Sequence, residues 1–555
     1  MTLKPWVEKY DPNVPRSIQY PDIPVSQFLS ESAQQFPNRV SAIYGEWKFT
    51  YQQIDSLSTD FARSLVENGI KKGEPIGLLL VNSPQFVIAF YGILKAGGVV
   101  VAMNPAYLQR ELAFQINDSG INRLFCEESR LDFLNTTLPL TSVKNVVFTS
   151  DKDLDEIFAL AVSGKDATSE KWHNLHKDSL ASFLLAGSLS TTKLPNVQGE
   201  DVAIYQYSGG TTGVPKAAEG THYNVVANTI QFRSWLYGLK EGEEVVMAAI
   251  PLFHVYGMVI ALSMGIALGA SIILEPNPRN FESILNNIQK YGATLFPGVP
   301  NIYNAINRHP DVQSGKIRLD TIKACISGSA TLMKETKEKF ETYTGGKLLE
   351  GYGLSEAPTA THCNPMMGEN RIGSIGLPLP DVVAEIVSLE DGQTRMPVYI
   401  PGELIIKGPQ IMRGYHNKDA ETRNAIKDGW LYTGDVAYMD DDGYFYLVDR
   451  KKDVIKVGGL QVWPNEIEQA ISEHPDVLEV GVVGVVHSEF GERVKAFVVK
   501  KPGSELTGDE VKTWCAAHLA RFKVPSYVQF IDQLPRSSVG KVLRRELNKL
   551  QDNNN

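Results

Sequence analysis

The chain has 555 residues, a length that corresponds to roughly two to four domains. Its hydrophobic content of 43% and charged content of 21% are values of a globular protein with a sizeable core. The net charge of −10 argues against nucleic acid as a partner. The cysteines lie far apart without a C-x-x-C pair, which supports neither a disulfide framework nor a zinc site and suits the cytoplasm; they are Cys126, Cys325, Cys363 and Cys515.

The N-terminal residues lack the apolar region of a secretory signal peptide, so we expect a cytoplasmic protein. The segment 255–274 carries no formal charge and is long enough to span a membrane. Because Gly257, Gly265 and Gly269 interrupt it, a buried helix that runs into a buried strand is the preferred interpretation. Peripheral contact with a membrane stays open.

The N-terminal part alternates apolar runs of strand length with amphipathic stretches of helical period. Strands are predicted at 39–44, 75–82, 99–102, 123–126 and 201–207, and helices at 25–35, 50–69, 84–96, 111–117 and 223–236. Residues 130–198 show no sustained hydrophobic periodicity and are interpreted as an excursion, a section that leaves the regular strand–helix alternation. Alternating strands and helices predict a parallel α/β sheet.

The alternation continues to about residue 353, with strands predicted at 246–249, 271–274, 294–296 and 323–326. Later the pattern changes to short strands at 385–387, 402–406 and 444–448. A charged run at 449–453 precedes a last section with helices at 464–473 and from 541, and strands at 480–485 and 494–499.

The sequence therefore predicts an α/β fold with two domains. Residues 1–451 form a large N-terminal domain with parallel sheets and a β-rich subdomain, and residues 452–555 form a small α+β domain. The two are joined by a hinge at about Lys452, within the charged run.

One stretch, residues 207–216, combines glycines, hydroxyl side chains and a final lysine: Tyr207, Ser208, Gly209, Gly210, Thr211, Thr212, Gly213, Val214, Pro215 and Lys216. Glycine allows tight turns whose successive amides bind anions. The common phosphate loop needs Gly directly before Lys, and here Val214 and Pro215 intervene. The residues predict a loop that binds a polyphosphate, with an ordinary polar loop as the alternative.

Five further motifs each have an ordinary structural explanation. His254 in an apolar run is typical of a core histidine, and Gly351 to Glu356 could be a capped turn. The functional interpretations are a histidine that lines an acceptor pocket, an aromatic ring for a purine at Tyr352, and a Mg²⁺ ligand at Glu356. The other three are Thr433-Gly434-Asp435 as a ribose-binding turn or plain turn, 449–459 as a hinge or solvated face, and Gly540-Lys541 as a mobile lysine or surface residue.

In this order and spacing, the motifs resemble those of the acyl-adenylating superfamily, which contains acyl-CoA synthetases, peptide-synthetase adenylation domains and firefly-type luciferases. The resemblance runs from about residue 20 to 550, and the long-chain fatty acid–CoA ligases are the most similar group within it. The chain departs from the pattern in two places: Ala217 follows the loop lysine where the family usually has Gly, and Ser355 replaces the commoner Thr.

The resemblance implies an ATP-dependent acid–thiol ligase that forms an acyl-AMP, releases pyrophosphate and transfers the acyl group to coenzyme A. It implies Lys541, Glu356 and His254 as catalytic residues, with Glu356 on Mg²⁺. It implies movement about Lys452 that brings Lys456, Gly458 and Gly459 to the site for the CoA step. The implied ATP-binding residues are Tyr207, Ser208, Gly209, Gly210, Thr211, Thr212, Gly213, Lys216, Gly328, Ser329, Ala330, Gly351, Tyr352, Gly353, Ser355, Asp435 and Arg450.

The expected substrates are ATP, CoA and a carboxylic acid, preferably a medium- to long-chain fatty acid. The alternatives are an aryl acid such as coumarate or benzoate, a carrier protein in place of CoA, a luciferase-like oxygenase and a non-catalytic binding protein. The oligomeric state is not readable from the sequence, and a homodimer stays among the options.

Overall fold

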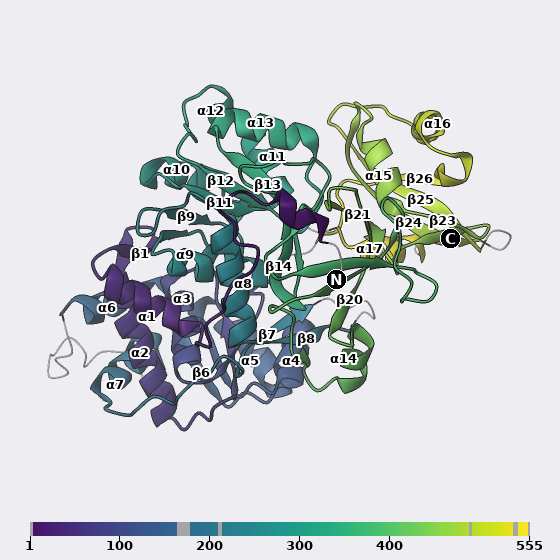
Figure 1. Ribbon diagram of the computed structural model, residues 1–555. Coiled ribbons are helices and arrows are strands. Elements are labelled where there is room, and N and C mark those ends of the chain that lie inside the picture. The colour runs from purple at the N-terminus through teal and green to yellow at the C-terminus, as the bar shows by residue number, and fades with distance from the viewer. Residues whose placement is uncertain (1–3, 164–177, 209–213, 488–490, 537–541, 553–555) are drawn as a thin grey trace. The chain divides into compact units, whose positions relative to one another are not determined.

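The computed structural model describes residues 4–163, 178–208, 214–487, 491–536 and 542–552. The chain divides into two compact units (Figure 1). The larger unit consists of Trp6–Val383 and Lys407–Gly429, and the smaller one of Met1–Pro5, Ala384–Ile406 and Trp430–Asn555.

The first sheet of the larger unit has the order β18-β8-β7-β4-β3-β5-β6. Its strands β3 to β7 are parallel, whereas β8 is antiparallel to β7 and β18 is antiparallel to β8. The bounds are β3 Pro75–Leu79, β4 Val99–Ala102, β5 Arg123–Glu127, β6 Asn145–Thr149, β7 Val202–Ser208, β8 Lys216–Thr221 and β18 Gly414–Tyr415.

The second sheet of the larger unit has the order β15-β14-β13-β12-β11-β9-β10-β1-β2. Its middle is parallel, and β2, β14 and β15 add antiparallel edges. The bounds are β1 Val40–Tyr44, β2 Trp47–Thr50, β9 Val245–Ala248, β10 Ser271–Leu274, β11 Leu295–Gly298, β12 Ala324–Ser327, β13 Lys347–Leu354, β14 Ala357–Cys363 and β15 Leu377–Pro378.

Helices of the larger unit form where the sequence supplies caps and one apolar face. Thr50 and Gln53 form a reciprocal capping box at the start of α2, Tyr51–Glu67. Ile54, Leu57, Phe61 and Leu65 of α2 are fully or almost fully buried, as helical spacing predicts. The other helices are α1 Ser26–Gln35, α3 Pro84–Lys95, α4 Gln109–Ser119, α5 Leu131–Thr137, α6 Asp151–Ser163, α7 Leu180–Leu189, α8 His222–Trp235, α10 Phe281–Tyr291, α11 Pro300–Arg308, α12 Pro310–Gln313, α13 Lys334–Thr344 and α14 Asp419–Ala425, which precedes β19 Ile426–Lys427.

The uncharged segment 255–274 is a buried helix followed by a buried strand, which confirms its preferred interpretation. A π-helical stretch, Gly257–Ser263, leads into α9, Met264–Ala267, and then β10. A side chain at Gly257 would meet the carbonyl oxygen of Pro251 at 2.3 Å, so this glycine allows backbone to pack closely. In the parts of the chain that the structure describes, helices are too short or too polar to cross a membrane.

The first sheet of the smaller unit contains β16 Val383–Val387, β17 Gly402–Lys407, β20 Trp430–Met439 and β21 Phe445–Arg450, in which β20 pairs with both β17 and β21. A second sheet has the order β23-β22-β25-β24, and β26 pairs with β25. Its bounds are β22 Ile455–Val457, β23 Leu460–Val462, β24 Val477–His487, β25 Gly491–Lys500 and β26 Tyr527–Phe530.

Three helices cover the two faces of this second sheet, and their contacts follow strand alternation. Helices α15, Pro464–Ser472, and α16, Gly508–His518, share a core with Val482 and Ala496. Helix α17, Arg544–Asp552, packs through Leu547 against Val483 and Phe497, the neighbours of those residues on the opposite face. The predicted α+β character of the C-terminal section is thereby confirmed, and its predicted bounds, residues 452–555, stay a prediction.

Three local predictions need correction. Residues 130–198 are not an irregular excursion, because they include α5, β6, α6 and α7 in their described part. Lys216 begins a strand and does not end a loop. Among the described residues the last helix begins at Arg544, and Lys541 lies outside them. The division into two compact units does not show where the chain bends, so the hinge at about Lys452 stays a prediction.

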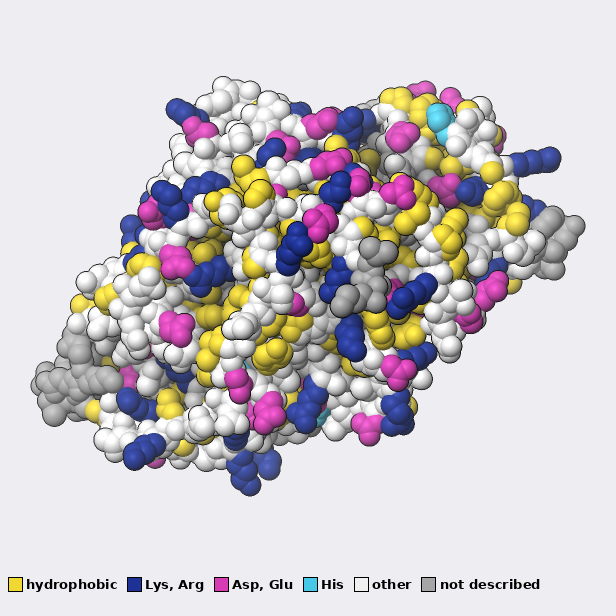
Figure 2. Space-filling model, in the orientation of Figure 1, with side chains coloured by type: hydrophobic (Ala, Val, Ile, Leu, Met, Phe, Trp, Pro, Cys, Tyr) yellow, Lys and Arg dark blue, Asp and Glu magenta, His cyan; other side chains and the backbone are white. Residues whose placement is uncertain are grey.

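On the face drawn in Figure 2, lysine and arginine side chains are interspersed with aspartate and glutamate side chains. Apolar side chains lie between them in small groups. The net charge of −10 is therefore not concentrated in a single acidic field on this face.

Candidate functional site

The two ends of the predicted phosphate loop are held by antiparallel strands. Ser208, the last residue of β7, pairs with Lys216, the first residue of β8. Gly209, Gly210, Thr211, Thr212 and Gly213 lie outside the described residues. Because Ser208 ends β7, which pairs in parallel with β4, it lies at the edge where α/β sheets usually bind ligands.

Tyr207 anchors the first end of the loop. Its hydroxyl donates a hydrogen bond of 2.8 Å to Oδ2 of Asp118, in α4. Burial, with the neighbouring Asp118 carboxylate, raises the pKa of Tyr207, so the phenol stays protonated at neutral pH. Nζ of Lys418 lies 3.5 Å from Asp118 and balances its charge. Tyr207 is thus positioned as a support at the entrance to the loop.

Ala217, the departure from the family pattern, belongs to a buried strand. It is fully buried and lies in a core cluster with Tyr205, Val101 and Leu112. Its carbonyl oxygen accepts a hydrogen bond of 2.9 Å from the backbone N–H of His416. The methyl group therefore packs in the core, and the backbone of Ala217 is held in strand β8 and is not part of the loop.

Glu356 lies beside the loop, in the turn between β13 and β14. Oε1 of Glu356 accepts hydrogen bonds from the hydroxyl of Ser208 at 3.0 Å and from the hydroxyl of Tyr415 at 2.9 Å. Within the described parts of the chain, no residue donates a hydrogen bond to Oε2 of this carboxylate. Two donors therefore hold one oxygen and leave the other for a ligand.

Tyr415, in β18, is a residue that the sequence did not reveal. Its ring lies under Nζ of Lys216, 5.3 Å from the ring centre, so one side chain contacts both charged groups beside the loop. Tyr415 is 59 residues from Glu356, and β18 reaches this place only by pairing with β8. A tyrosine after a glycine is too common a pattern to have identified it.

Gly328, Ser329 and Ala330 follow β12 at the carboxyl end of the second sheet, next to Glu350 of β13. Ser329 has a φ of 69°, a left-handed conformation that is uncommon for residues other than glycine. The backbone N–H of Leu332 donates a hydrogen bond of 3.2 Å to Oε1 of Glu350, which ties this turn to β13. Burial raises the pKa of Glu350 to about 8.

The glycines of the 351–356 motif have a packing role. A Cβ on Gly353 would lie 1.5 Å from the carbonyl oxygen of Thr359, so only glycine fits against β14 there. The ring of Tyr352 is 8% exposed and meets His362 edge-on, with 5.9 Å between ring centres. Ser355 and Glu356 form the turn of this hairpin. Purine stacking by Tyr352 stays a prediction.

His254 lies in a bend three residues before the buried π-helical stretch Gly257–Ser263. Its Nδ1 accepts a hydrogen bond of 3.2 Å from the backbone N–H of Tyr256, which leaves Nε2 as the protonated nitrogen of the neutral ring. Burial lowers the pKa of His254 to about 4, so the ring is neutral at pH 7. The hydroxyl of Tyr256 donates to the carbonyl oxygens of Ile326 at 2.7 Å and Gly298 at 3.1 Å, which joins this segment to β11 and β12.

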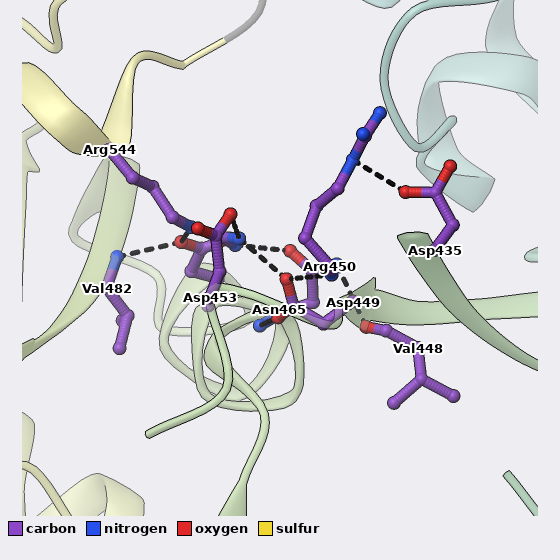
Figure 3. A network of polar contacts seen from close by, with 9 residues as sticks. Asp435, Val448, Asp449, Arg450, Asp453, Asn465, Val482 and Arg544 are labelled. Carbon is purple, nitrogen blue, oxygen red and sulfur yellow. Dashed lines mark hydrogen bonds and ion pairs between the residues drawn. The ribbon is translucent and has the colours of Figure 1, made fainter. Parts of the chain in front are cut away.

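The predicted ribose-binding pair lies within the smaller unit. Nε of Arg450 is 2.6 Å from Oδ1 of Asp435, and the two residues are opposite each other in β20 and β21 (Figure 3). Thr433 donates a hydrogen bond of 2.7 Å from its hydroxyl to Leu404 and accepts one of 3.0 Å from the N–H of Asp435. Gly434 has a φ of 70°. The expected turn is therefore an irregular part of β20.

Residues of the predicted hinge and CoA step follow β21. Lys452 lies in a turn, and Lys456 is exposed in β22. Gly458 and Gly459 have φ values of 58° and 85° and connect β22 to β23. A Cβ on Gly459 would meet no atom within 4 Å. Glycine is therefore favoured there by its positive φ and not by close packing. Lys541 lies outside the described residues.

No group of three or more His, Cys, Asp or Glu side chains able to hold a metal occurs in the described portions of the chain. Glu356 offers a single carboxylate whose second oxygen takes no hydrogen bond from the described residues. That donor set fits Mg²⁺, which often binds one or two carboxylates together with phosphate oxygens and water.

Comparison with known proteins covers almost the whole chain. The family described as AMP-binding enzyme matches residues 29–416, and the AMP-binding enzyme C-terminal domain matches residues 466–541. A long-chain-fatty-acid–CoA ligase of Bacillus subtilis is 41% identical over 98% of this chain and 97% of its own length. One from Escherichia coli is 37% identical over 98% of both chains. The solved structure of ATP-bound MatB from Rhodopseudomonas palustris, 26% identical, has a TM-score of 0.82 and covers 95% of this chain and 99% of its own.

Proposed function

Because the chain belongs to the family of AMP-binding enzymes, we propose that it is an AMP-forming acyl-CoA synthetase whose preferred acid is a medium- to long-chain fatty acid. The predicted resemblance to acyl-adenylating enzymes is confirmed by the family match and by ligases at 37–41% identity. The preference for a fatty acid is supported by these relatives, which are named long-chain-fatty-acid–CoA ligases.

The observation that carries the proposal is the cluster of Ser208, Glu356, Tyr415 and Lys216 at the ends of the predicted phosphate loop. It combines a cation, a carboxylate with one oxygen available, and hydroxyl donors. Those groups suit a nucleotide triphosphate with its metal, because the phosphates need positive charge and the metal needs a carboxylate.

In the first half-reaction, a carboxylate oxygen of the acid attacks the α-phosphorus of ATP. A new oxygen–phosphorus bond forms, the bond to the β-phosphate breaks, and pyrophosphate leaves. The protein contributes position and charge. The loop with Lys216 holds the leaving phosphates, Asp435 and Arg450 hold the ribose, and Lys541 bridges the carboxylate and the α-phosphate. The turn after β12 and the 351–353 segment frame the adenine.

Glu356 is the residue that would hold Mg²⁺, through Oε2, while Ser208 and Tyr415 orient the carboxylate through Oε1. When bound, Mg²⁺ neutralises negative charge on the phosphate oxygens. The two hydroxyl donors keep the carboxylate in one orientation and so lower the cost of ordering it.

In the second half-reaction, the thiolate of CoA attacks the acyl carbon, the carbon–sulfur bond forms and AMP leaves. His254, neutral at pH 7 because burial lowers its pKa to about 4, donates a hydrogen bond from Nε2 to the acyl oxygen and carries no charge. The C-terminal section turns about Lys452, so that Lys456, Gly458 and Gly459 replace Lys541 at the site.

The test is pyrophosphate release with acids of increasing chain length, with and without CoA. We expect the highest kcat/KM with acids of medium or long chain, and acyl-CoA formation only when ATP and Mg²⁺ are present. A preference for coumarate or benzoate would overturn the fatty-acid assignment. Acyl transfer to the pantetheine of a carrier protein but not to CoA would overturn the synthetase assignment.

Cytoplasmic location, peripheral contact with a membrane and a homodimer stay predictions from the sequence. Flotation with vesicles of mixed phosphatidylglycerol and phosphatidylethanolamine tests the membrane contact. Light scattering of the purified chain tests the homodimer.

A further inference from the structure

Arg544, the first residue of α17, lies at the centre of a polar network in the smaller unit (Figure 3). Its Nη1 is 2.7 Å from Oδ1 of Asp449 and 3.4 Å from Oδ2 of Asp453. Its Nη2 is 2.6 Å from Oδ1 of Asn465 and 2.9 Å from Oε2 of Glu468. One guanidinium thus contacts three carboxylates and one side-chain amide.

The acidic partners are themselves fixed. The side chain of Asp449 is 1% exposed, and it accepts backbone hydrogen bonds from Arg450 at 2.7 Å and Asn465 at 2.8 Å. Glu468 accepts one of 2.7 Å from the N–H of Val482. Buried carboxylates that lose their cation are costly, so Arg544 is needed to keep them charged. Burial raises the pKa of Glu468, and Arg544 acts in the opposite direction.

The contacts of Arg544 lie on both sides of the predicted hinge. Asp449 belongs to β21, before Lys452, and the next residue, Arg450, bonds to Asp435 at 2.6 Å. Asp453, Asn465 and Glu468 come after Lys452. If the chain turns about Lys452, the contacts with Glu468 and Asn465 move as one body with α17. The contacts of Asp449 with Arg544 and with the backbone N–H of Asn465 join the two sides, so a turn about Lys452 would change them.

The orientation in which these contacts are formed suits the first half-reaction. Arg544 lies against the residue that precedes Arg450, the predicted ribose ligand, and it is three residues after Lys541 in the chain. The bond to Asp449 thus links β21, which carries the predicted ribose ligand Arg450, to the helix that follows the predicted catalytic lysine in the sequence; Lys541 itself lies outside the described residues. Adenylate formation needs the predicted ribose ligand Arg450 and Lys541 at the same nucleotide. Thioester formation needs Lys541 to leave the active site so that CoA can reach the acyl group.

We propose that Arg544 is a positioning residue for adenylate formation, and that its bond to Asp449 joins the two sides of the hinge in the first half-reaction and breaks before the second. This inference rests on the proposed function and on the hinge at Lys452. It gives Arg544 and Asp449 a role besides stabilising the C-terminal domain: their bond favours the conformation for adenylate formation over the conformation for thioester formation.

The experiment separates the two half-reactions in the full-length chain. ATP–pyrophosphate exchange with a fatty acid measures the first, and acyl-CoA formation from supplied acyl-AMP measures the second. We expect Arg544→Met to lower exchange at least tenfold and to leave the second rate within twofold or raise it. Arg544→Lys, which keeps the charge, should restore part of the exchange.

Arg545 is the matched control, because it neighbours Arg544 in the same helix and its side chain is 65% exposed. Arg545→Met should leave both rates within twofold. Because Arg544→Met could unfold the domain, Asp449→Asn is the second variant; it keeps the shape and one of the two acceptor oxygens but removes the charge that bonds Arg544 across the hinge. It should lower exchange selectively as well.

Hydrogen–deuterium exchange of peptides within 449–457 gives a readout independent of activity. Without ligands, these peptides should exchange faster in Arg544→Met and Asp449→Asn than in Arg545→Met. Equal losses of both half-reactions, or no selective loss in either variant, would overturn the inference. If the parent chain itself formed no acyl-AMP with any acid, the proposed function would fail, which the parent assay shows before any variant is made.

Discussion

The hydroxyl of Tyr415 donates a hydrogen bond of 2.9 Å to Oε1 of Glu356, and the ring of the same tyrosine lies 5.3 Å below Nζ of Lys216. One side chain therefore supports the predicted metal ligand and the predicted phosphate-binding lysine at once. Ser208 donates to the same carboxylate oxygen. Four residues from three separate parts of the chain thus meet at the ends of the phosphate loop.

Replacing Tyr415 by Phe keeps the ring below Lys216 and removes only the hydroxyl. A hydrogen bond to a charged group contributes about 1.5–3 kcal/mol, so we expect pyrophosphate exchange to fall about tenfold or more. The Mg²⁺ concentration for half-maximal exchange should rise. Tyr237→Phe is the control, because Tyr237 is 45% exposed. An unchanged Mg²⁺ dependence would show that the hydroxyl does not orient Glu356.

Replacing Lys541 by Ala should affect the two half-reactions unequally. Two unit charges about 4 Å apart interact by roughly 4 kcal/mol at an effective dielectric near 20, which corresponds to about a thousandfold in rate. Adenylate formation should fall by that order, and thioester formation from supplied acyl-AMP by less than about tenfold. Lys549→Ala, in the exposed part of α17, should change neither rate. Equal losses in both half-reactions would contradict the assigned role of Lys541.

Replacing Ala217 by Gly should cost stability and leave ATP binding nearly unchanged. The loss of a buried methyl and the added freedom of glycine together amount to about 1.5 kcal/mol of unfolding free energy. Urea unfolding measures that loss, and the KM for ATP should stay within twofold. Ala218→Gly is the matched control, one residue further in the same buried strand. A KM change of more than fivefold in Ala217→Gly alone would mean that Ala217 controls the loop.

Glu350 predicts a pH dependence of stability. Burial raises its pKa to about 8 from the ordinary value of 4.5, so between these values the folded protein binds the proton and the unfolded chain does not. The protonated carboxyl therefore contributes stability below about pH 4.5, and the contribution is lost as pH rises to about 8. Glu350→Gln, which stays neutral, should gain unfolding free energy relative to the parent across this range.

The measurement is chemical unfolding of the parent and of Glu350→Gln at several pH values between 5 and about 9. Glu338→Gln is the control, because the side chain of Glu338 is 58% exposed. A difference between Glu350→Gln and the parent that does not change with pH would contradict the raised pKa.

Much of the fold was predictable because its signals are local. The apolar run at 75–82 contains strand β3, the helices predicted from residues 50 and 84 begin at Tyr51 and Pro84, and the uncharged segment 255–274 is buried. The region 130–198 was misjudged because α5 has only 7 residues and the apolar residues of α7 do not gather on one face. Strand β8 was missed because Lys-Ala-Ala-Glu-Gly-Thr has low strand propensity, and pairing with β7 decides its conformation.

By itself, the sequence determined the chemical groups of the phosphate loop and, through the order and spacing of six motifs, the family, because each motif is a local property and their order is read along the chain. Only the tertiary structure decided that Ser208 and Tyr415 meet at Glu356, and that Arg544 bonds Asp449 from 95 residues away. Contacts between such distant residues depend on sheet pairing and on buried charge that needs a partner, which no short stretch of sequence records. The loop that the motif describes is thus supported by residues that the motif does not contain.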